Sequence, residues 1–157
     1  MLNDGQKKLA AIGIFIVACI AALLSFNSQE HFTKHDVLGI VPGMTRDQVK
    51  KLITVRKWVC PIATADSVDC KTDAGRLTVT FIDANEASPV AGASIVLSNQ
   101  GSLSFADTVK AVSSQYDRSP AHLSNDRVTW NLDGDLSLVL VHDSAFKLSL
   151  GRKQSAS

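Results

Sequence analysis

The sequence predicts an α+β fold, with an N-terminal transmembrane helix followed by an antiparallel sheet that two helices cover on one face. Three observations predict it. An uncharged apolar run fills residues 9–26, two amphipathic segments begin at capping residues Thr45 and Ser104, and alternating apolar and polar residues follow each segment. Alternation indicates strands with one buried face, whereas a spacing of three to four residues indicates a helix. The expected organisation is a signal anchor or transmembrane segment at 1–26, a polar tether at 27–36, an extracytoplasmic domain at 37–151 and a disordered tail at 152–157.

Length and charge limit the class of protein. The chain has 157 residues, 16 of them Lys or Arg and 15 Asp or Glu, and its formal net charge is +1. The part that follows residue 26 is the size of one ordinary domain. Nucleic-acid-binding domains usually carry a strong basic excess, so we expect no nucleic-acid partner.

The apolar run 9–26 decides the expected compartment. As a helix it would measure about 27 Å, close to the roughly 30 Å thickness of the bilayer hydrocarbon. Lys7 and Lys8 precede it, and positive charge favours a cytoplasmic N-terminus. These features predict a protein of the bacterial inner membrane whose C-terminal domain lies in the periplasm.

Three fates of this run remain open. Its length is typical of a retained signal anchor. Small residues at positions 18–22 also offer sites for a signal peptidase. The stretch Ile16-Val17-Ala18-Cys19 resembles a bacterial lipobox, which makes Cys19 a lipidation candidate. All three fates place the following domain outside the cytoplasm.

The first element of the domain is a predicted helix that begins after the turn Pro42-Gly43. Thr45 is a good N-cap, and Gln48 three residues later completes a capping box. Val49 and Leu52 follow at helical spacing, so one side of this helix is expected to face a core.

A short strand at 57–60 and a polar loop ending at Cys70 are expected next. Cys60 and Cys70 are predicted to form a disulfide, because an exported domain meets an oxidising environment. The bridge would stabilise the domain by about 2.5–3 kcal/mol in the loop-entropy treatment. Two unpaired thiols are the alternative.

The rest of the domain repeats one pattern. Alternating segments at 77–81 and 93–97 predict an antiparallel pair of strands. A second helix is expected from Ser104, which Asp107 supports from the third helical position, and strands near 128–132, 136–140 and 146–150 follow. Each half therefore has a helix followed by two or three strands, which suggests tandem α-β-β-β units.

The sequence contains no arrangement typical of an enzyme, cofactor site or metal site. His142 ends a strand and is interpreted as a locally hydrogen-bonded histidine, and His122 lies in a loop with no carboxylate partner beyond Asp126. A hydrolase would need either histidine within hydrogen-bond reach of a serine and a carboxylate in a cleft. We therefore expect no catalytic residues, cofactor or metal. Trp58, Tyr116 and Trp130 are the aromatic residues that an inhibitor or ligand sensor would expose.

The stretch Gly43-Met44-Thr45-Arg46-Asp47-Gln48-Val49-Lys50-Lys51-Leu52 resembles the opening of SmpA/OmlA-type small lipoproteins. These proteins belong to the outer-membrane barrel-assembly machinery of Gram-negative bacteria. Similar helix-and-sheet units occur in tandem in proteinaceous β-lactamase inhibitors. The resemblance implies an α+β fold in the cell envelope, and it assigns no partner-binding residue.

The function these features favour is a non-catalytic protein-interaction module, anchored in the membrane and exposed to the periplasm. Its partner would be another envelope protein, bound through a sheet edge or an exposed helix side. The alternatives are an inhibitor or ligand-sensing domain of the tandem type and, with less support, a small hydrolase that uses His142 or His122.

Overall fold

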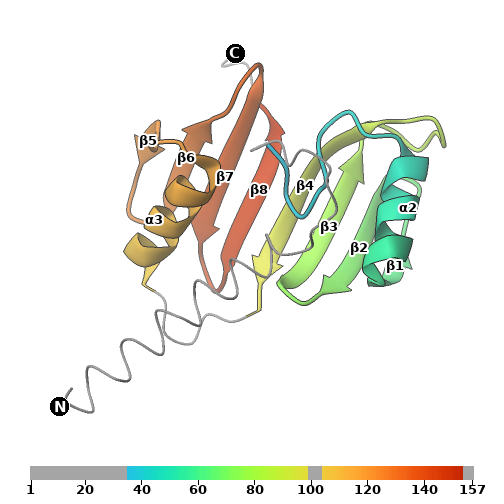
Figure 1. Ribbon diagram of the computed structural model, residues 1–157, viewed down its shortest axis with the longest axis horizontal. Coiled ribbons are helices and arrows are strands. Elements are labelled where there is room, and N and C mark those ends of the chain that lie inside the picture. Colours follow the sequence, from blue (N-terminus) through green and yellow to red (C-terminus); the bar gives the residue numbers. More distant parts are fainter. Residues whose placement is uncertain (1–34, 99–103, 154–157) are drawn as a thin grey trace, which may run out of the picture. The chain divides into compact units, whose positions relative to one another are not determined.

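The computed structural model describes residues 35–98 and 104–153, which belong to one compact unit, Phe32–Ser157. The elements, labelled in Figure 1, are α2 (Arg46–Arg56), β1 (Val59–Ala63), β2 (Ser67–Thr72), β3 (Gly75–Phe81), β4 (Val90–Leu97), α3 (Phe105–Tyr116), β5 (His122–Leu123), β6 (Arg127–Asn131), β7 (Leu136–His142) and β8 (Phe146–Arg152).

The strands form one eight-stranded sheet in the order β1-β2-β3-β4-β8-β7-β6-β5. Every neighbouring pair is antiparallel. Each half of the described chain is a helix followed by four strands that pair in sequence order. The two halves join where β4 pairs with β8, from Gly92 opposite Gly151 to Val96 opposite Lys147.

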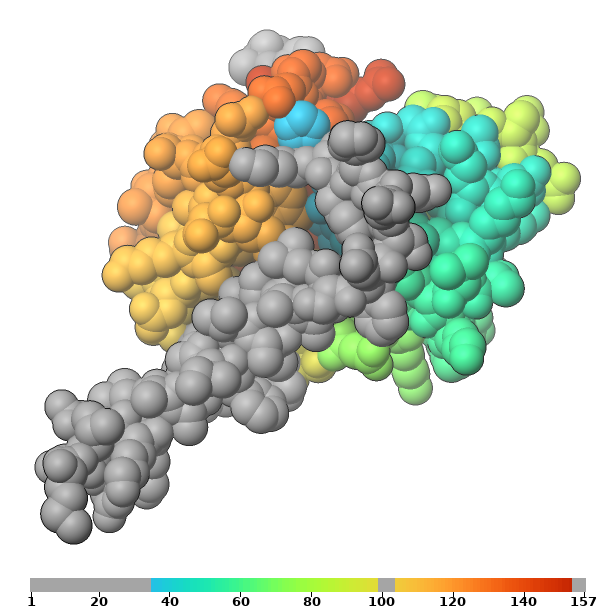
Figure 2. All heavy atoms as spheres, viewed as in Figure 1, coloured from blue at the N-terminus to red at the C-terminus, as the bar shows by residue number. Residues whose placement is uncertain are grey.

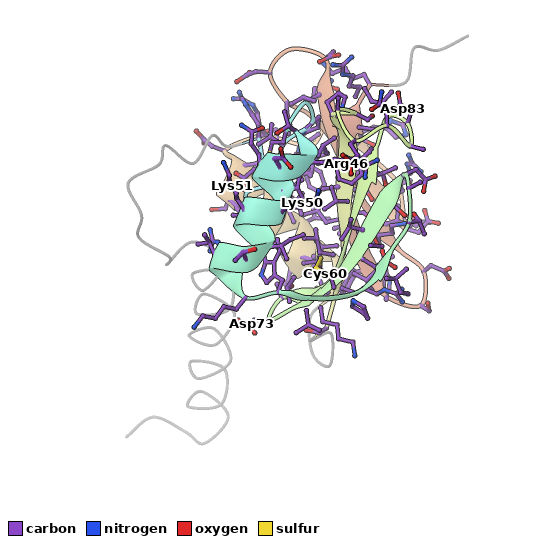
Figure 3. The ribbon with its side chains drawn as sticks, turned by 90° about the vertical axis from the view of Figure 1, so that its right-hand side faces the viewer. Arg46, Lys50, Lys51, Cys60, Asp73 and Asp83 are labelled. Atoms are coloured by element: carbon purple, nitrogen blue, oxygen red, sulfur yellow. A yellow bond between two sulfur atoms is a disulfide. The ribbon has the colours of Figure 1, made fainter. Side chains whose placement is uncertain are left out.

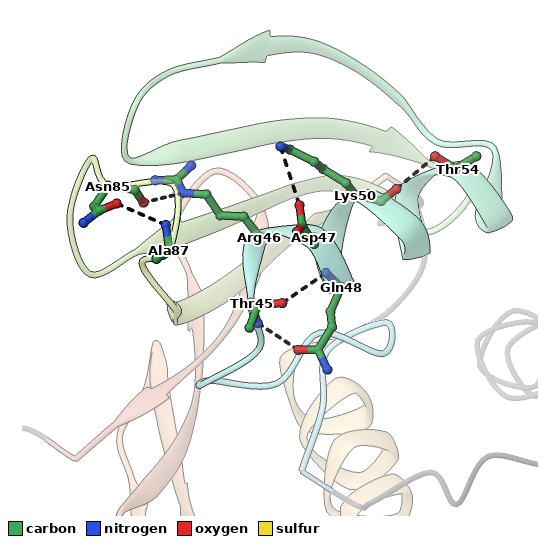
Figure 4. Close-up of polar contacts among 8 residues, drawn as sticks. All are labelled: Thr45, Arg46, Asp47, Gln48, Lys50, Thr54, Asn85 and Ala87. Carbon is green, nitrogen blue, oxygen red and sulfur yellow. Dashed lines mark hydrogen bonds and ion pairs between the residues drawn. The ribbon is translucent and has the colours of Figure 1, made fainter.

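Local sequence signals explain both helices. At the start of α2 the backbone N–H of Thr45 donates to Oε1 of Gln48 (2.8 Å), while the Thr45 hydroxyl accepts from the Gln48 N–H, which is the predicted capping box (Figure 4). At α3 the Ser104 hydroxyl accepts from the N–H of Asp107 (3.1 Å). The two predicted helix starts are therefore confirmed.

The core lies on one face of the sheet. The register aligns one buried residue from each of six adjacent strands: Cys70, Leu77, Ile95, Leu148, Leu140 and Val128. Both helices lie on this side, where Val49 of α2 and Val112 of α3 join the same core (Figure 1). Figure 2 views this side, with α2 and α3 at its two ends.

The segment before α2 completes the core between the helices. Val37 and Ile40 are buried and pair with each other through two backbone hydrogen bonds of 3.0 Å. The buried hydroxyl of Tyr116 in α3 donates to the backbone oxygen of Asp36 (2.6 Å). The start of the domain is thus held against the end of α3.

The predicted fold class is wrong. The described residues form mainly one eight-stranded antiparallel sheet with two helices, and each half has four strands after its helix. Within residues 35–98 and 104–153, no helix is long and apolar enough to cross a membrane. Their helices have 11 and 12 residues, whereas a span needs about 20. The run 9–26, to which the transmembrane helix was assigned, lies outside the described residues.

Two smaller expectations also need correction. The stretch expected to be a polar loop before Cys70 contains most of the hairpin of β1 and β2. Arg152, expected to begin a disordered tail, belongs to β8, and the backbone N–H of Lys153 donates to the oxygen of Asp135 (2.6 Å). The rest of the expected tail, 154–157, lies outside the described residues.

Candidate interaction surface

The disulfide between Cys60 and Cys70 is present, which confirms that prediction. Cys70 is buried in β2, and Cys60 lies opposite it in β1. Because β1 is the outermost of the described strands, the bridge holds it to β2, the one described strand that pairs with it. Cys19, the lipidation candidate, lies outside the described residues.

The β1 edge is poorly suited to adding a further strand. Val59 and Ile62 are exposed, but the pairing with β2 is irregular between them, where Pro61 lies. Proline has no N–H to donate to a new strand, and bulges and prolines are common ways to block a sheet edge. This observation weakens the edge as the binding surface expected from the sequence.

Arg46 has a structural role at the first residue of α2. Its guanidinium donates to the backbone oxygens of Ala65, Asp83 and Asn85 and lies over the Phe81 ring, 3.8 Å from its centroid. Ala65 lies in the β1–β2 loop, and Asp83 and Asn85 lie in the β3–β4 loop. Figures 3 and 4 show the Arg46 side chain extending from the helix toward the β3–β4 loop. The planar guanidinium suits several carbonyls and an aromatic face at once, so Arg46 ties α2 to both loops.

The outward side of α2 offers little for recognition. Lys50 and Lys51 are exposed, and Lys50 lies 3.8 Å from Asp47 one turn earlier in the helix. Exposed pairs of this kind contribute little stability or specificity. The same helix carries one exposed apolar residue, Val55, which is 76% exposed. A single apolar residue and exposed lysines give the helix-side route predicted from the sequence only weak support.

The candidate catalytic histidines are not brought to a reactive site. The His142 ring stacks on the rings of Phe105 and Phe146, with centroids 5.9 and 4.4 Å away, and those two rings lie 6.2 Å from each other. His122 lies exposed in the edge strand β5. Among the described residues, no group of three or more His, Cys, Asp or Glu side chains could hold a metal ion.

The aromatic residues expected of an inhibitor are used for packing. Trp130 is fully buried, and its ring N–H donates to the Ser113 hydroxyl (3.0 Å). Tyr116 is buried, and Trp58 packs against the core. Burial and the nearby Asp36 raise the pKa of the Tyr116 hydroxyl, which therefore stays protonated and can donate.

The carboxyl group of Asp36 is the main perturbed acid on the helix side. Burial raises its pKa above the usual aspartate range, although it accepts a hydrogen bond from the backbone N–H of Gly39. Next to it, His35 pairs with Asp133 (2.9 Å), which also binds Arg118 (2.6 Å). These contacts hold the segment before α2 against the β6–β7 turn.

The opposite face of the sheet is not covered by α2, α3 or the segment before α2 (Figures 1 and 3). We call it the open face. It consists of the strand residues that alternate with the core residues, and the register arranges them in three rows across six strands. The first row is Lys71, Arg76, Val96, Lys147, Val141 and Arg127; the second is Asp69, Thr78, Ser94, Ser149, Val139 and Thr129; the third is Ser67, Thr80, Gly92, Gly151, Ser137 and Asn131.

The first row, which we call the basic row, concentrates positive charge on the open face. Its four cations Lys71, Arg76, Lys147 and Arg127 are exposed, whereas the three rows contain one acid, Asp69. Arg76 and the Thr78 hydroxyl each donate to Asp69 at 2.6 Å, and these bonds lower the pKa of its carboxyl group. Asp69 is therefore ionised and already paired.

The sequence pattern alone does not reveal the open face. Alternation along one strand shows that one side is polar, but the charges come from β2, β3, β6 and β8. Only the strand order, with β4 beside β8, places them in one row.

Comparison with known proteins adds no assignment: no family model matches the chain, and neither the curated proteins nor the solved structures contain a match. The resemblance of residues 43–52 to SmpA/OmlA-type lipoproteins stays a prediction.

Proposed function

We propose that this chain is a non-catalytic interaction domain of the bacterial cell envelope that binds another envelope protein. The observation that carries the proposal is the open face, a broad sheet surface with no helix over it in the described part of the chain. The stability of a sheet with one buried face does not require a particular pattern of charges on its exposed face. Among the described residues, the unpaired cations on the open face are therefore better explained by binding of a partner than by stability of the fold.

We further propose that the domain lies on the periplasmic side of the inner membrane, with residues 1–26 directing its export and attachment. The Cys60–Cys70 bridge supports this location, because disulfides persist in the periplasm and are rare in the bacterial cytoplasm. The apolar run 9–26 after Lys7 and Lys8 is the second support.

The alternatives have less support. An inhibitor or ligand sensor would need a concave sheet face rich in exposed aromatics or polar groups, and two of its three candidate aromatics, Trp130 and Tyr116, are buried. A hydrolase would need a histidine within hydrogen-bond reach of a nucleophile and a carboxylate, whereas His142 stacks on two phenylalanine rings.

In-cell crosslinking of the full chain tests the interaction. Cells that naturally produce the protein would be treated with a short amine crosslinker that enters the periplasm, and tagged adducts would be identified by mass spectrometry. The control is an unrelated exported domain with the same tag and leader. We expect one envelope protein to be enriched over the control; capture of the same proteins by both would contradict the proposal.

A further inference from the structure

We infer that the open face is the docking surface and that its partner presents an acidic protein surface to the basic row. This inference rests on the proposed function and specifies where and what the domain binds. Three properties of the open face lead to it: unpaired charge, size, and the small side chains at its centre.

The charge is the first property. Within residues 35–98 and 104–153, Lys71, Lys147 and Arg127 have no ion-pair partner. Lys71 also lies directly opposite Arg76, and like charges in that position destabilise a sheet. Stability therefore does not account for the basic row, whereas a partner with carboxylates opposite these cations would.

The size of the surface is the second property. Strands lie about 4.8 Å apart, so the basic row extends roughly 24 Å from β2 to β6 and the whole sheet is roughly 34 Å wide. With strands about 17–20 Å long, the open face covers roughly 600–700 Å² before side-chain relief is counted. A stable interface buries about 800 Å² on each partner, so this face alone approaches the required area.

The centre of the open face is the third property. Gly92, Ser94, Ser149, Gly151 and Ser137 surround the seam of β4 and β8. Such short side chains lose little rotamer freedom on binding and let a partner approach the backbone. Val96 and Val141 lie between the cations of the basic row and are half-buried. They offer apolar contact beside the charges.

These residues suit a protein better than a lipid surface. Proteins that lie on a bilayer insert aromatic or long aliphatic side chains beside their basic residues. The three rows contain no aromatic residue, leucine, isoleucine or methionine. Their continuation into β1 adds the exposed Val59, opposite Lys71, and Ile62, opposite Asp69, but no aromatic residue. The serine and threonine hydroxyls of the three rows can each donate and accept hydrogen bonds with the polar groups of a partner protein.

Site-specific photocrosslinking in the full chain, expressed in its natural host, tests the docking surface. Benzoylphenylalanine would replace Thr80 or Asn131, which are exposed on the open face, or Lys51 or Lys110, which are exposed on α2 and α3. We expect a polypeptide adduct from the first two positions and none from the last two. Adducts from the helix positions alone would overturn the docking surface but leave the proposed function standing.

Two other outcomes are informative. An adduct of phospholipid mass from Thr80 or Asn131 would overturn the protein partner in favour of a lipid. The absence of adducts from all four positions would overturn the docking surface and the proposed function together.

Charge reversal tests the acidic nature of the partner. Lys147→Glu with Arg127→Glu should reduce the adduct from Thr80 at least tenfold. Lys51→Glu with Lys110→Glu changes the net charge equally on the helices and should leave the adduct unchanged. Replacing acids with lysine in the crosslinked segment of the partner should restore binding to the doubly reversed variant. Equal adducts from both double variants would overturn the role of the basic row.

Discussion

Gly92 offers a sharp test of the seam that joins the two halves of the sheet. A Cβ added to Gly92 would lie 2.7 Å from the backbone oxygen of Leu150, closer than real Cβ contacts. Gly151 is its direct partner across the seam, and a Cβ added there would have nothing within 4 Å. The two glycines therefore form a matched pair, one crowded and one open.

The expected cost follows from this contact. For Gly92→Ala the backbone must separate by several tenths of an ångström, and such overpacking costs about 1–3 kcal/mol. The reduced freedom of the unfolded chain returns about 0.4–1 kcal/mol, so the free energy of unfolding should fall by about 1–2 kcal/mol. For a domain of this size that change lowers Tm by about 4–8 °C.

Thermal unfolding followed by circular dichroism, with urea titration as a second measure, checks this prediction. Gly151→Ala should leave Tm unchanged or raise it slightly, because only the unfolded-chain effect applies. If Gly92→Ala were as stable as the wild type, or if Gly151→Ala lost as much stability as Gly92→Ala, the pairing of β4 with β8 would have to be reconsidered.

Three further predictions concern stability. Replacing Cys60 and Cys70 together with serine should lower the free energy of unfolding in urea by about 2–3 kcal/mol; a loss under 1 kcal/mol would contradict the stapling role. Arg46→Lys keeps the charge but loses the planar group that donates to three carbonyls, so the free energy of unfolding should fall by about 1–2 kcal/mol and Tm should fall with it. An unchanged Tm would argue against this structural role of Arg46. Burial raises the pKa of the Asp36 carboxyl group in the folded protein. The free energy of unfolding therefore falls as pH rises from the unfolded aspartate pKa, about 3.9, to the raised folded pKa. Asp36→Asn should therefore be more stable than the wild type at pH 7 and equal to it below about pH 3.5, and equal urea midpoints at pH 7 would refute this.

Local signals in the sequence were sufficient for the helices and several strands. The capping residues Thr45 and Ser104 fix the starts of α2 and α3, because each side-chain oxygen accepts a hydrogen bond from a backbone N–H three residues later. This interaction is local and does not depend on the rest of the fold. The alternation at residues 77–81 appears in β3 because each second residue enters the core. Its predicted antiparallel pairing with the strand at 93–97 is confirmed by β3 and β4.

The edge of the sheet was hidden from this reasoning. Four of the five residues of β1 are exposed, so Val59–Ala63 carries no alternation. In β2 only Cys70 is fully buried. An edge strand that a disulfide holds in place can remain stable with few buried apolar residues. Its sequence therefore lacks the alternation that predicts a strand and resembles that of a loop.

The open face was hidden for a different reason. The pairing of β4 with β8 joins residues from 51 (Val96 and Lys147) to 59 (Gly92 and Gly151) positions apart in the chain, and no local signal specifies it. Until that pairing is known, Arg76 and Lys147 have no relation to each other. The candidate surface therefore depends on topology, which the sequence patterns left undetermined.

Export of the domain is the claim on which the proposed partner and location depend, and the redox state of Cys60 and Cys70 in living cells tests it most directly. Cells would be quenched with acid and alkylated without reductant, and the two cysteines would be examined by peptide mass mapping. We expect both to be unmodified until a reductant is added. Complete alkylation of both in the freshly quenched protein would place the domain in a reducing compartment and contradict the proposed location.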